Sequence, residues 1–209
     1  FTSIHLNNHL STMSENTADQ EEDFGPSATP GYKITEKKSI QEYQNLDAND
    51  ESLNRWKASL GLTSSAPGPA DDPRRVVILE LALEVSGRPD VVLDLSDAAN
   101  LEEIKKKPFV IKEGVEYRMK VKFRIQHEVI TGLKYLQVVK RKGIRDKMEE
   151  MIGSYGPSDQ PYEKKFPIEE APSGILYRGH YSAKSKFVDD DGKVHVQWSW
   201  SFDIKKDWS

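Results

Sequence analysis

Apolar and polar residues alternate through much of the chain after residue 74, and this pattern predicts β-strands. The clearest alternation covers residues 115–126, where Val, Tyr, Met, Val, Phe and Ile are separated by Glu, Arg, Lys and Gln. Successive side chains of a strand point to opposite faces, so this segment predicts a long strand with one buried face. Apolar runs predict further strands at 76–85, 91–95, 135–139, 175–181, 183–188 and 194–204. A hairpin turn is expected at Asp189-Asp190-Asp191-Gly192, and a helical turn at 101–107.

Seven to nine strands joined by short turn signals predict an all-β fold, an immunoglobulin-like antiparallel β-sandwich over residues 74–209. The segment before it has a helical pattern instead. Ser39 and Glu42 have the spacing of a capping box, and Asn49-Asp50-Glu51 supplies a second helix start. Leu53, Trp56 and Leu60 then follow on one face. Helices this short are marginal alone, so residues 32–62 are expected to form a flexible arm with two short helices that needs a partner surface.

Composition separates two further segments. Residues 1–31 contain five acidic residues and no Lys or Arg, so they carry a charge of −5 and are expected to be a disordered head. Residues 63–73 are rich in proline and have no hydrophobic period, which is typical of a linker. Met13 is followed by Ser-Glu-Asn and is a candidate initiator. If translation starts at Met13, residues 1–12 are upstream sequence. If it starts earlier, they are native.

The whole chain has 209 residues, no cysteine and a net charge of −4. Without cysteine there is no disulfide framework and no thiolate metal site. No apolar run reaches the length of a membrane span, and no Asn-x-Ser/Thr acceptor occurs. The net charge gives no reason to expect nucleic-acid binding. These features predict a cytosolic protein.

Motifs for catalysis are not found in the sequence. The five histidines have no metal-ligand spacing, and there is no nucleophile elbow, P-loop or dinucleotide motif. Trp198 and Trp200 are two residues apart in a predicted strand, so both point to one face. They are either ordinary core residues or the lining of a cavity for an apolar ligand between the sheets. The sequence thus predicts a binding module and not an enzyme, with no metal and no cofactor.

Several segments together resemble one family. They are Lys38-Ser-Ile-Gln-Glu42, Asp50-Glu-Ser-Leu53, Phe109-Val-Ile-Lys-Glu-Gly-Val-Glu-Tyr117, Gly132-Leu-Lys-Tyr135, Gly153-Ser-Tyr-Gly-Pro157, Glu169-Glu-Ala-Pro172, Phe187-Val-Asp-Asp-Asp191 and Ile204-Lys-Lys-Asp-Trp208. In this order they are similar to the Rho GDP-dissociation inhibitors, over about residues 32–209.

The resemblance implies a cytosolic protein that binds prenylated Rho, Rac and Cdc42 GTPases, preferentially with GDP, as a monomer in a 1:1 complex. Such a protein blocks GDP release and extracts the GTPase from membranes, which it meets transiently. It shelters the geranylgeranyl chain, the implied ligand, in a pocket between the sheets. The arm folds onto the GTPase switch regions.

The resemblance also assigns roles to residues. Switch contacts are implied for Asp50, Ser52 and Trp56, the last in place of a usual Tyr. The implied prenyl-pocket residues are Leu83, Phe109, Tyr117, Val129, Trp198 and Trp200. The implied contacts to the basic tail of the GTPase are Glu169, Glu170, Asp190 and Asp191.

By the same resemblance, Pro108 and His180 stand where animal members can carry phosphorylatable serines, so control of release through those two positions is not expected. Three other classes of protein compete with this interpretation. A general prenyl carrier for non-Rho cargo would not need the arm. An adhesion-type immunoglobulin domain is disfavoured by the missing cysteine pair, and an enzyme by the absence of catalytic motifs.

Overall fold

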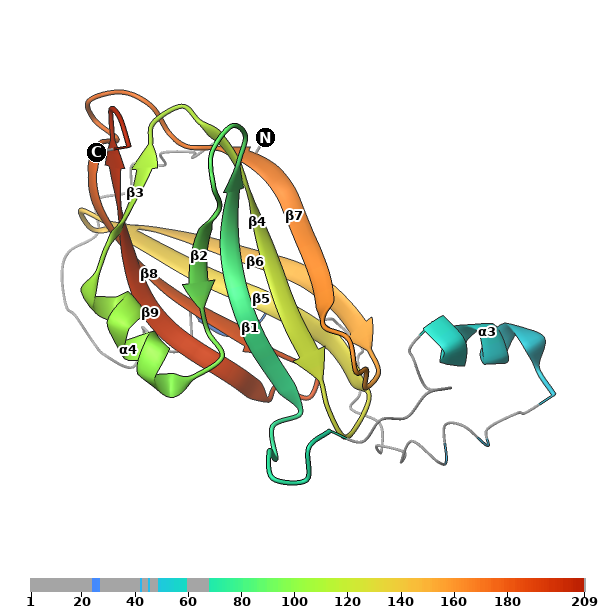
Figure 1. The fold of residues 1–209 in the computed structure, drawn as a ribbon. Helices are drawn as coiled ribbons and strands as arrows, with labels where there is room; N and C mark the ends of the chain where they lie inside the picture. The colour runs from blue at the N-terminus through green and yellow to red at the C-terminus, as the bar shows by residue number, and fades with distance from the viewer. Residues whose placement is uncertain (1–23, 27–41, 43–44, 46–48, 60–67, 209) are drawn as a thin grey trace.

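The computed structural model describes residues 24–26, 42, 45, 49–59 and 68–208. Within them, two β-sheets pack face to face, as Figure 1 shows. The strands are β1 (Val76–Val85), β2 (Val91–Asp94), β3 (Phe109–Lys112), β4 (Glu116–Ile125), β5 (Ile130–Arg141), β6 (Ile144–Tyr155), β7 (Tyr162–Glu170), β8 (Gly179–Val188) and β9 (Val194–Lys205). The helices are α3 (Glu51–Ser59) and α4 (Ala98–Lys106).

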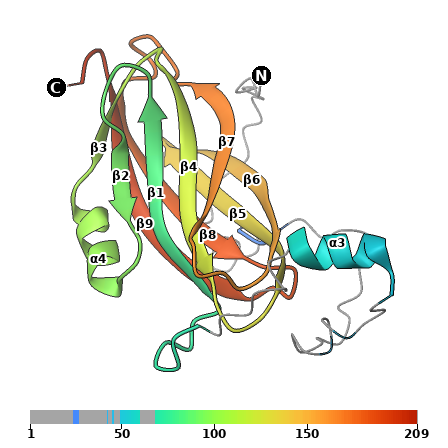
Figure 2. The same cartoon turned by 45° about the vertical axis from the view of Figure 1, so that its right-hand side comes forward.

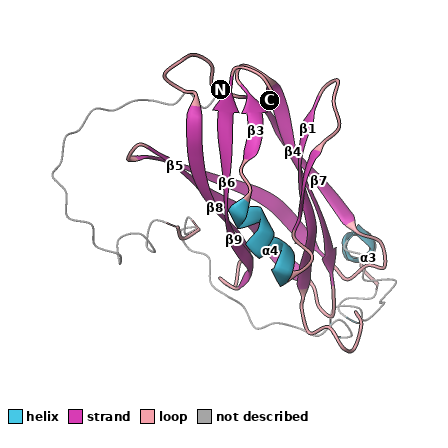
Figure 3. Ribbon diagram, turned by 60° about the vertical axis from the view of Figure 1, so that its left-hand side comes forward, coloured by secondary structure: helices cyan, strands magenta, loops and turns pink. Residues whose placement is uncertain are grey.

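One sheet has the strand order β2-β1-β4-β7, and the other has the order β3-β9-β8-β5-β6. Neighbouring strands are antiparallel except β3 and β9, which run parallel. The predicted all-β sandwich is therefore confirmed, with one parallel pair at the edge of the larger sheet. Helix α4 contacts both β9 and β2, so it bridges the two sheets along one side of the sandwich (Figure 3).

The core lies between the sheets and is rich in aromatic residues. Phe123 from β4, Tyr135 from β5 and Phe187 from β8 are fully buried. The rings of Tyr135 and Phe187 have centroids 5.0 Å apart. The alternation in β4 is as predicted, because Met119, Val121, Phe123 and Ile125 are buried and the residues between them are not.

Two parts of the strand prediction were wrong. Residues 175–177 form a turn, and the strand begins only at Gly179. Ile175 and Leu176 are 79% and 77% exposed, so their apolar character does not indicate a buried strand. The alternation analysis also missed β3, β6 and β7. The helical turn expected at 101–107 is a full helix, capped by the Asp97 side chain, which accepts a hydrogen bond from the Ala99 N–H at 3.0 Å.

The arm is only partly within the described residues. Helix α3 is present as predicted, beside the sandwich in Figures 1 and 2. Of the first predicted helix only Glu42 and Asn45 are described, and both are helical. Most of the acidic head and residues 63–67 of the linker also lie outside the described residues. No helix formed by the described residues is long and apolar enough to span a membrane.

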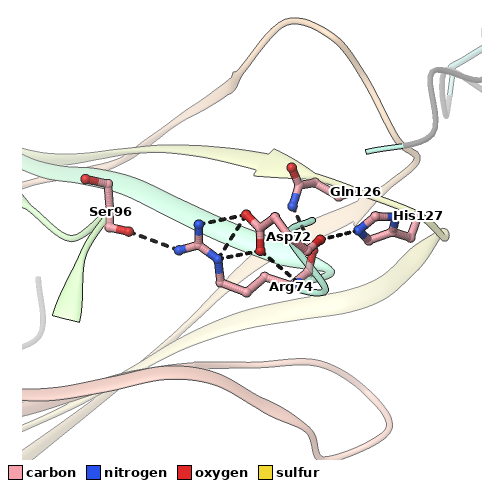
Figure 4. A network of polar contacts seen from close by, with 5 residues as sticks. All are labelled: Asp72, Arg74, Ser96, Gln126 and His127. Atoms are coloured by element: carbon pink, nitrogen blue, oxygen red, sulfur yellow. Dashed lines mark hydrogen bonds and ion pairs between the residues drawn. The ribbon is translucent and has the colours of Figure 1, made fainter. Parts of the chain in front are cut away.

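The last residues of the predicted linker are fixed to the start of the sandwich (Figure 4). The Arg74 guanidinium donates to the Asp72 carboxylate at 2.7 and 2.8 Å and to the Ser96 carbonyl at 3.0 Å. His127 Nε2 donates to the Asp72 carbonyl at 2.6 Å, and the Gln126 amide donates to the Arg74 carbonyl at 2.8 Å. Hydrogen bonds from Arg74 hold the pKa of Asp72 well below its usual range, because they stabilise the charged carboxylate. We call these five residues the anchor network.

Candidate functional site

Two predicted pocket residues from the larger sheet meet at its β3–β9 edge. In the parallel pair, Phe109 lies opposite Phe202, and Trp200 is two residues before Phe202 on the same face. The Phe109 and Trp200 rings are 6.0 Å apart in an edge-to-face arrangement. The Trp200 and Phe202 rings are 5.4 Å apart. Sequence reasoning did not single out Phe202, although its alternation with Trp198 and Trp200 could have indicated it.

Two more predicted pocket residues lie on the smaller sheet and pack against the same core. In the β1–β4 pair, Leu83 lies opposite Met119, and Tyr117 lies opposite Val85. Leu83 and Tyr117 are half-buried and pack against the core, as do Phe109 and Trp200. We call these four residues the rim, because they border the fully buried core instead of forming it.

Helix α4 lies where the two sheets separate along the β2 and β3 edges. Leu101 and Ile104 are half-buried and pack against the same core, while no residue of the helix is fully buried. Their i, i+3 spacing placed them on one helical face, but nothing in the sequence related that face to the pocket residues. Large half-buried apolar side chains from two sheets and a helix thus border the core on this side of the sandwich.

A chain of hydrogen bonds fixes the Trp200 side chain. Its indole Nε1 donates to the buried Ser185 hydroxyl at 2.9 Å, and Tyr135 donates to Gln137 Oε1 at 2.6 Å. The Ser185 hydroxyl therefore donates to the Tyr135 oxygen, 2.9 Å away. Burial raises the pKa of the Tyr135 phenol, so the phenol remains neutral. The polar groups of this hydrogen-bond chain are thus paired and uncharged, which suits an apolar ligand next to Trp200.

Trp198 has a different environment from Trp200. It is only 4% exposed and lies in the core. Its ring stacks on Phe187 at 6.0 Å and lies 6.2 Å from Tyr135. The two indoles share a face as predicted, but Trp198 is part of the core and Trp200 is part of the rim.

Val129 is not brought together with the rim. It follows the end of β4, whereas Tyr117 lies at the start of that strand. Ten residues of strand separate the two ends by about 30 Å, at roughly 3.3 Å per residue. The predicted grouping of Val129 with the other pocket residues is therefore not observed.

The four acidic residues expected to form one surface lie at two different ends of the sandwich. Glu169 and Glu170 end β7, opposite Tyr117 and Glu116 of β4. Tyr117 donates to Glu169 Oε2 at 2.8 Å. Burial, together with the Glu169 carboxylate, raises the pKa of the Tyr117 phenol, so the phenol donates this hydrogen bond at neutral pH.

Asp190 and Asp191 lie in the β8–β9 turn at the other end of the sandwich, and this turn is present as predicted. The Asp190 N–H donates to the Thr131 carbonyl at 3.1 Å, beside the start of β5. Buried Asp189 organises the turn by accepting hydrogen bonds from the backbone N–H groups of Asp191 and Lys193. The acidic residues therefore divide into a pair next to the rim and a pair far from it.

In the arm, Asp50 caps α3. Its side chain accepts hydrogen bonds from the N–H groups of Ser52 at 2.8 Å and Leu53 at 3.0 Å. Ser52 is exposed, so its hydroxyl is accessible to a partner. The backbone of Trp56 is in the helix, while its side-chain surroundings lie outside the described residues. The cap defines how this helix begins, and hence the orientation of its first turn.

Comparison with known proteins gives a consistent result. The family model for the RHO protein GDP dissociation inhibitor matches residues 13–207. The chain is 50% identical over 206 residues to the Rho GDP-dissociation inhibitor of Schizosaccharomyces pombe, covering 97% of this chain and 98% of that protein. It is 46% identical over 198 residues to human Rho GDP-dissociation inhibitor 1, with 94% of each chain covered. The Saccharomyces cerevisiae Rho GDP-dissociation inhibitor is 44% identical over 185 residues, covering 84% of this chain and 90% of that protein.

Proposed function

Because the chain belongs to the family of RHO protein GDP dissociation inhibitors, we propose that it shelters the geranylgeranyl chain of a Rho-family GTPase at the rim. Its function is Rho GDP-dissociation inhibition, and Rho-family GTPases are its partners. The family is one of regulatory inhibitors and not one of known enzymes. The proposal concerns how the lipid, the GTPase and the nucleotide state are recognised.

The observation that carries the lipid proposal is the contact of Phe109 and Trp200 across β3 and β9, opposite half-buried Leu83 and Tyr117. A ligand that enters here between the sheets meets aromatic faces and aliphatic side chains. Exposing a prenyl chain to water is costly, since each buried CH₂ contributes about 0.8 kcal/mol. Transfer from a bilayer to an apolar pocket roughly balances, because both environments are apolar. Additional contacts with the GTPase can then shift the exchange toward the aqueous complex.

The arm supplies these additional contacts in our proposal. Asp50, Ser52 and Trp56 contact the switch regions of the GTPase, and this contact favours the GDP-bound form by opposing nucleotide release. Capping of α3 by Asp50 supports this, because the cap orients the first turn that carries Ser52. Trp56 is the largest apolar side chain of this helix. Large aromatic side chains often dominate binding energy at protein interfaces.

The basic tail that precedes the prenylated cysteine meets Glu169 and Glu170 in this proposal. These exposed carboxylates adjoin Tyr117, so a tail bound there leads directly to the rim. Attraction between opposite charges guides such an encounter more than it adds affinity. The complex is a 1:1 assembly in the cytosol, formed during a transient encounter with the membrane.

The test is extraction from vesicles. Vesicles carrying a geranylgeranylated, GDP-bound Rho GTPase are mixed with this protein, and the GTPase that remains in the supernatant after sedimentation is measured. We expect release of the prenylated GTPase and, in a parallel pull-down, much weaker capture of the unprenylated form. Equal capture of both forms would contradict the lipid proposal. Equal release of a prenylated GTPase from outside the Rho family would indicate a general prenyl carrier.

A further inference from the structure

The outer face of the five-stranded sheet is strongly cationic. Strand pairing places Lys186, Leu136 and Glu149 in one row across β8, β5 and β6, and Lys184, Val138 and Lys147 in the next. Directly paired residues share a face, and Leu136 and Val138 face away from the core that contains Tyr135. The basic residues of this face on the three strands are Lys134, Lys140, Arg145, Lys147, Lys184 and Lys186, while Glu149 is the acidic one and lies 3.4 Å from Lys134.

An aliphatic stripe runs through this cationic face and is covered by Phe24. Phe24 is 7% exposed and forms a buried cluster with Leu136, Val138 and Val188. It belongs to the N-terminal head, of which residues 24–26 are drawn in blue beside β5 in Figure 2. Composition alone predicted disorder for the whole head and did not identify this contact. Without Phe24, three apolar side chains would be uncovered on the outside of the sheet, and such patches typically mark interaction sites.

Two lysines hold the same segment by different contacts. Lys186 Nζ lies 4.5 Å from the centre of the Phe24 ring, within the range of a cation–π interaction. Lys147 Nζ donates to the Gly25 carbonyl at 2.8 Å. The two cations come from β8 and β6, on either side of the stripe. The Phe24–Gly25 segment is therefore held by three contacts. The apolar cluster lies beneath the Phe24 ring, Lys186 lies near that ring, and Lys147 donates to the Gly25 carbonyl.

The charge of the segment before Phe24 complements this face. Glu21, Glu22 and Asp23 directly precede the phenylalanine, and no Lys or Arg occurs in residues 1–31. Because these residues adjoin Phe24 in the sequence, a head that docks through Phe24 would offer carboxylates to a cationic surface. Burial lowers the pKa of Lys186, and the nearby Lys147 lowers it further. A neighbouring carboxylate would stabilise the charged ammonium group of Lys186 and so offset both effects.

We propose that this cationic outer face is a docking surface whose occupant is the acidic N-terminal head of the same chain, anchored by Phe24 between Lys147 and Lys186. The inference goes beyond the proposed function, because it involves neither the rim nor the arm. It assigns the head a specific position on the sandwich and predicts that part of the cationic surface is shielded in the free protein.

Methyl NMR of the full chain tests this proposal. The ring of a docked Phe24 shifts the methyl resonances of Leu136, Val138 and Val188. We expect Phe24→Ala to reduce these shifts and to lower the equilibrium constant for docking by about tenfold or more, from the burial energy of an aromatic side chain. Phe1→Ala is the matched control, the same substitution in the same head, and should leave the three methyl resonances unchanged.

Charge is tested separately by Lys186→Gln, with Lys205→Gln on the same sheet as its control. The first variant should shift the methyl resonances partway toward those of Phe24→Ala, and the second should not. High salt at about 1 M, where the screening length is about 3 Å, should weaken docking in the same direction. Unchanged Leu136, Val138 and Val188 methyl resonances in a folded Phe24→Ala protein would overturn the proposal. Equal effects of Lys186→Gln and Lys205→Gln would overturn the role of Lys186.

Discussion

Replacing Trp200 by alanine should weaken lipid binding as well as destabilise the fold. Truncating a fully buried tryptophan costs about 3–5 kcal/mol in unfolding free energy. Trp200 is half-buried, so about half of that cost is expected, with about 1 kcal/mol more for its hydrogen bond to Ser185. Loss of the indole face that would contact the isoprenoid should cost about 1–3 kcal/mol of lipid binding. That loss corresponds to roughly 5–140-fold in Kd.

Trp198→Ala is the matched comparison, because Trp198 is 4% exposed and stacks within the core. It should cost the full 3–5 kcal/mol in stability. Thermal unfolding gives the stability of each variant, and titration with a fluorescent geranylgeranyl peptide gives its affinity for lipid. Weakened lipid binding by a Trp200→Ala protein that still unfolds cooperatively, and loses less stability than Trp198→Ala, would support the rim. Unchanged lipid affinity in a destabilised Trp200→Ala protein would refute the reasoning and make Trp200 an ordinary core residue.

Three other substitutions test separate parts of the structure. Asp50→Ala removes the cap of α3, which should cost about 0.5–2 kcal/mol of helix stability and speed release of labelled GDP from a bound Rho GTPase. Gly132→Ala should cost about 1–3 kcal/mol in urea unfolding, because Gly132 has φ +56° and an added Cβ would lie 1.8 Å from the Asp190 carboxylate. Asp72→Asn should destabilise the protein at neutral pH. Because the folded-state pKa of Asp72 is lowered, this difference should shrink as the pH falls below about 4.

Each of these expectations has an outcome that contradicts it. Wild-type GDP release with Asp50→Ala would mean that the cap is not needed for inhibition, provided that the sandwich unfolds at its usual temperature. Asp190→Ala should partly rescue Gly132→Ala, and failure to do so would show that the overlap with the carboxylate is not the cause. An Asp72→Asn difference that is constant from neutral pH to pH 2 would show that the Asp72 charge does not stabilise the fold.

The sequence predicted strands well where one face is buried and the other is in water. The bounds of β1 and the alternation of β4 are as predicted, because the hydrophobic period reports burial directly. Strand β6 was missed because it lies at a sheet edge and most of its side chains are exposed or half-buried. Strand β7 is an edge strand with Pro167 inside it, and both features weaken the pattern. The apolar pair Ile175 and Leu176 wrongly predicted a strand start, because both residues lie on an exposed turn.

The candidate site was predicted less completely than the fold. The family resemblance assigned pocket roles to Leu83, Phe109, Tyr117 and Trp200, and the structure packs all four against one core, with Phe109 and Trp200 in contact. It does not bring Val129 to them, because motif matching along the chain does not report which strand ends meet. For the same reason Glu169 and Asp190 were expected on one surface and lie at opposite ends. The part played by α4 also depends on tertiary packing, which a short helical pattern does not reveal.

The anchor network affects the combined strength of two contacts, the one proposed for the arm and the one proposed for the rim. It fixes the start of β1, so the chain toward the arm leaves the sandwich at the end away from Tyr117. Residues 60–71 can span at most about 40 Å between α3 and this fixed point. If the arm binds a GTPase as proposed, this tether limits how far the prenylated tail of that GTPase can lie from the sandwich. Short tethers of this kind give effective concentrations in the millimolar range and can raise overall affinity by about 10²–10⁴ without any new contact. Loosening the network would thus weaken capture of a prenylated GTPase, which is held at two points, while leaving the intrinsic affinity of each contact unchanged.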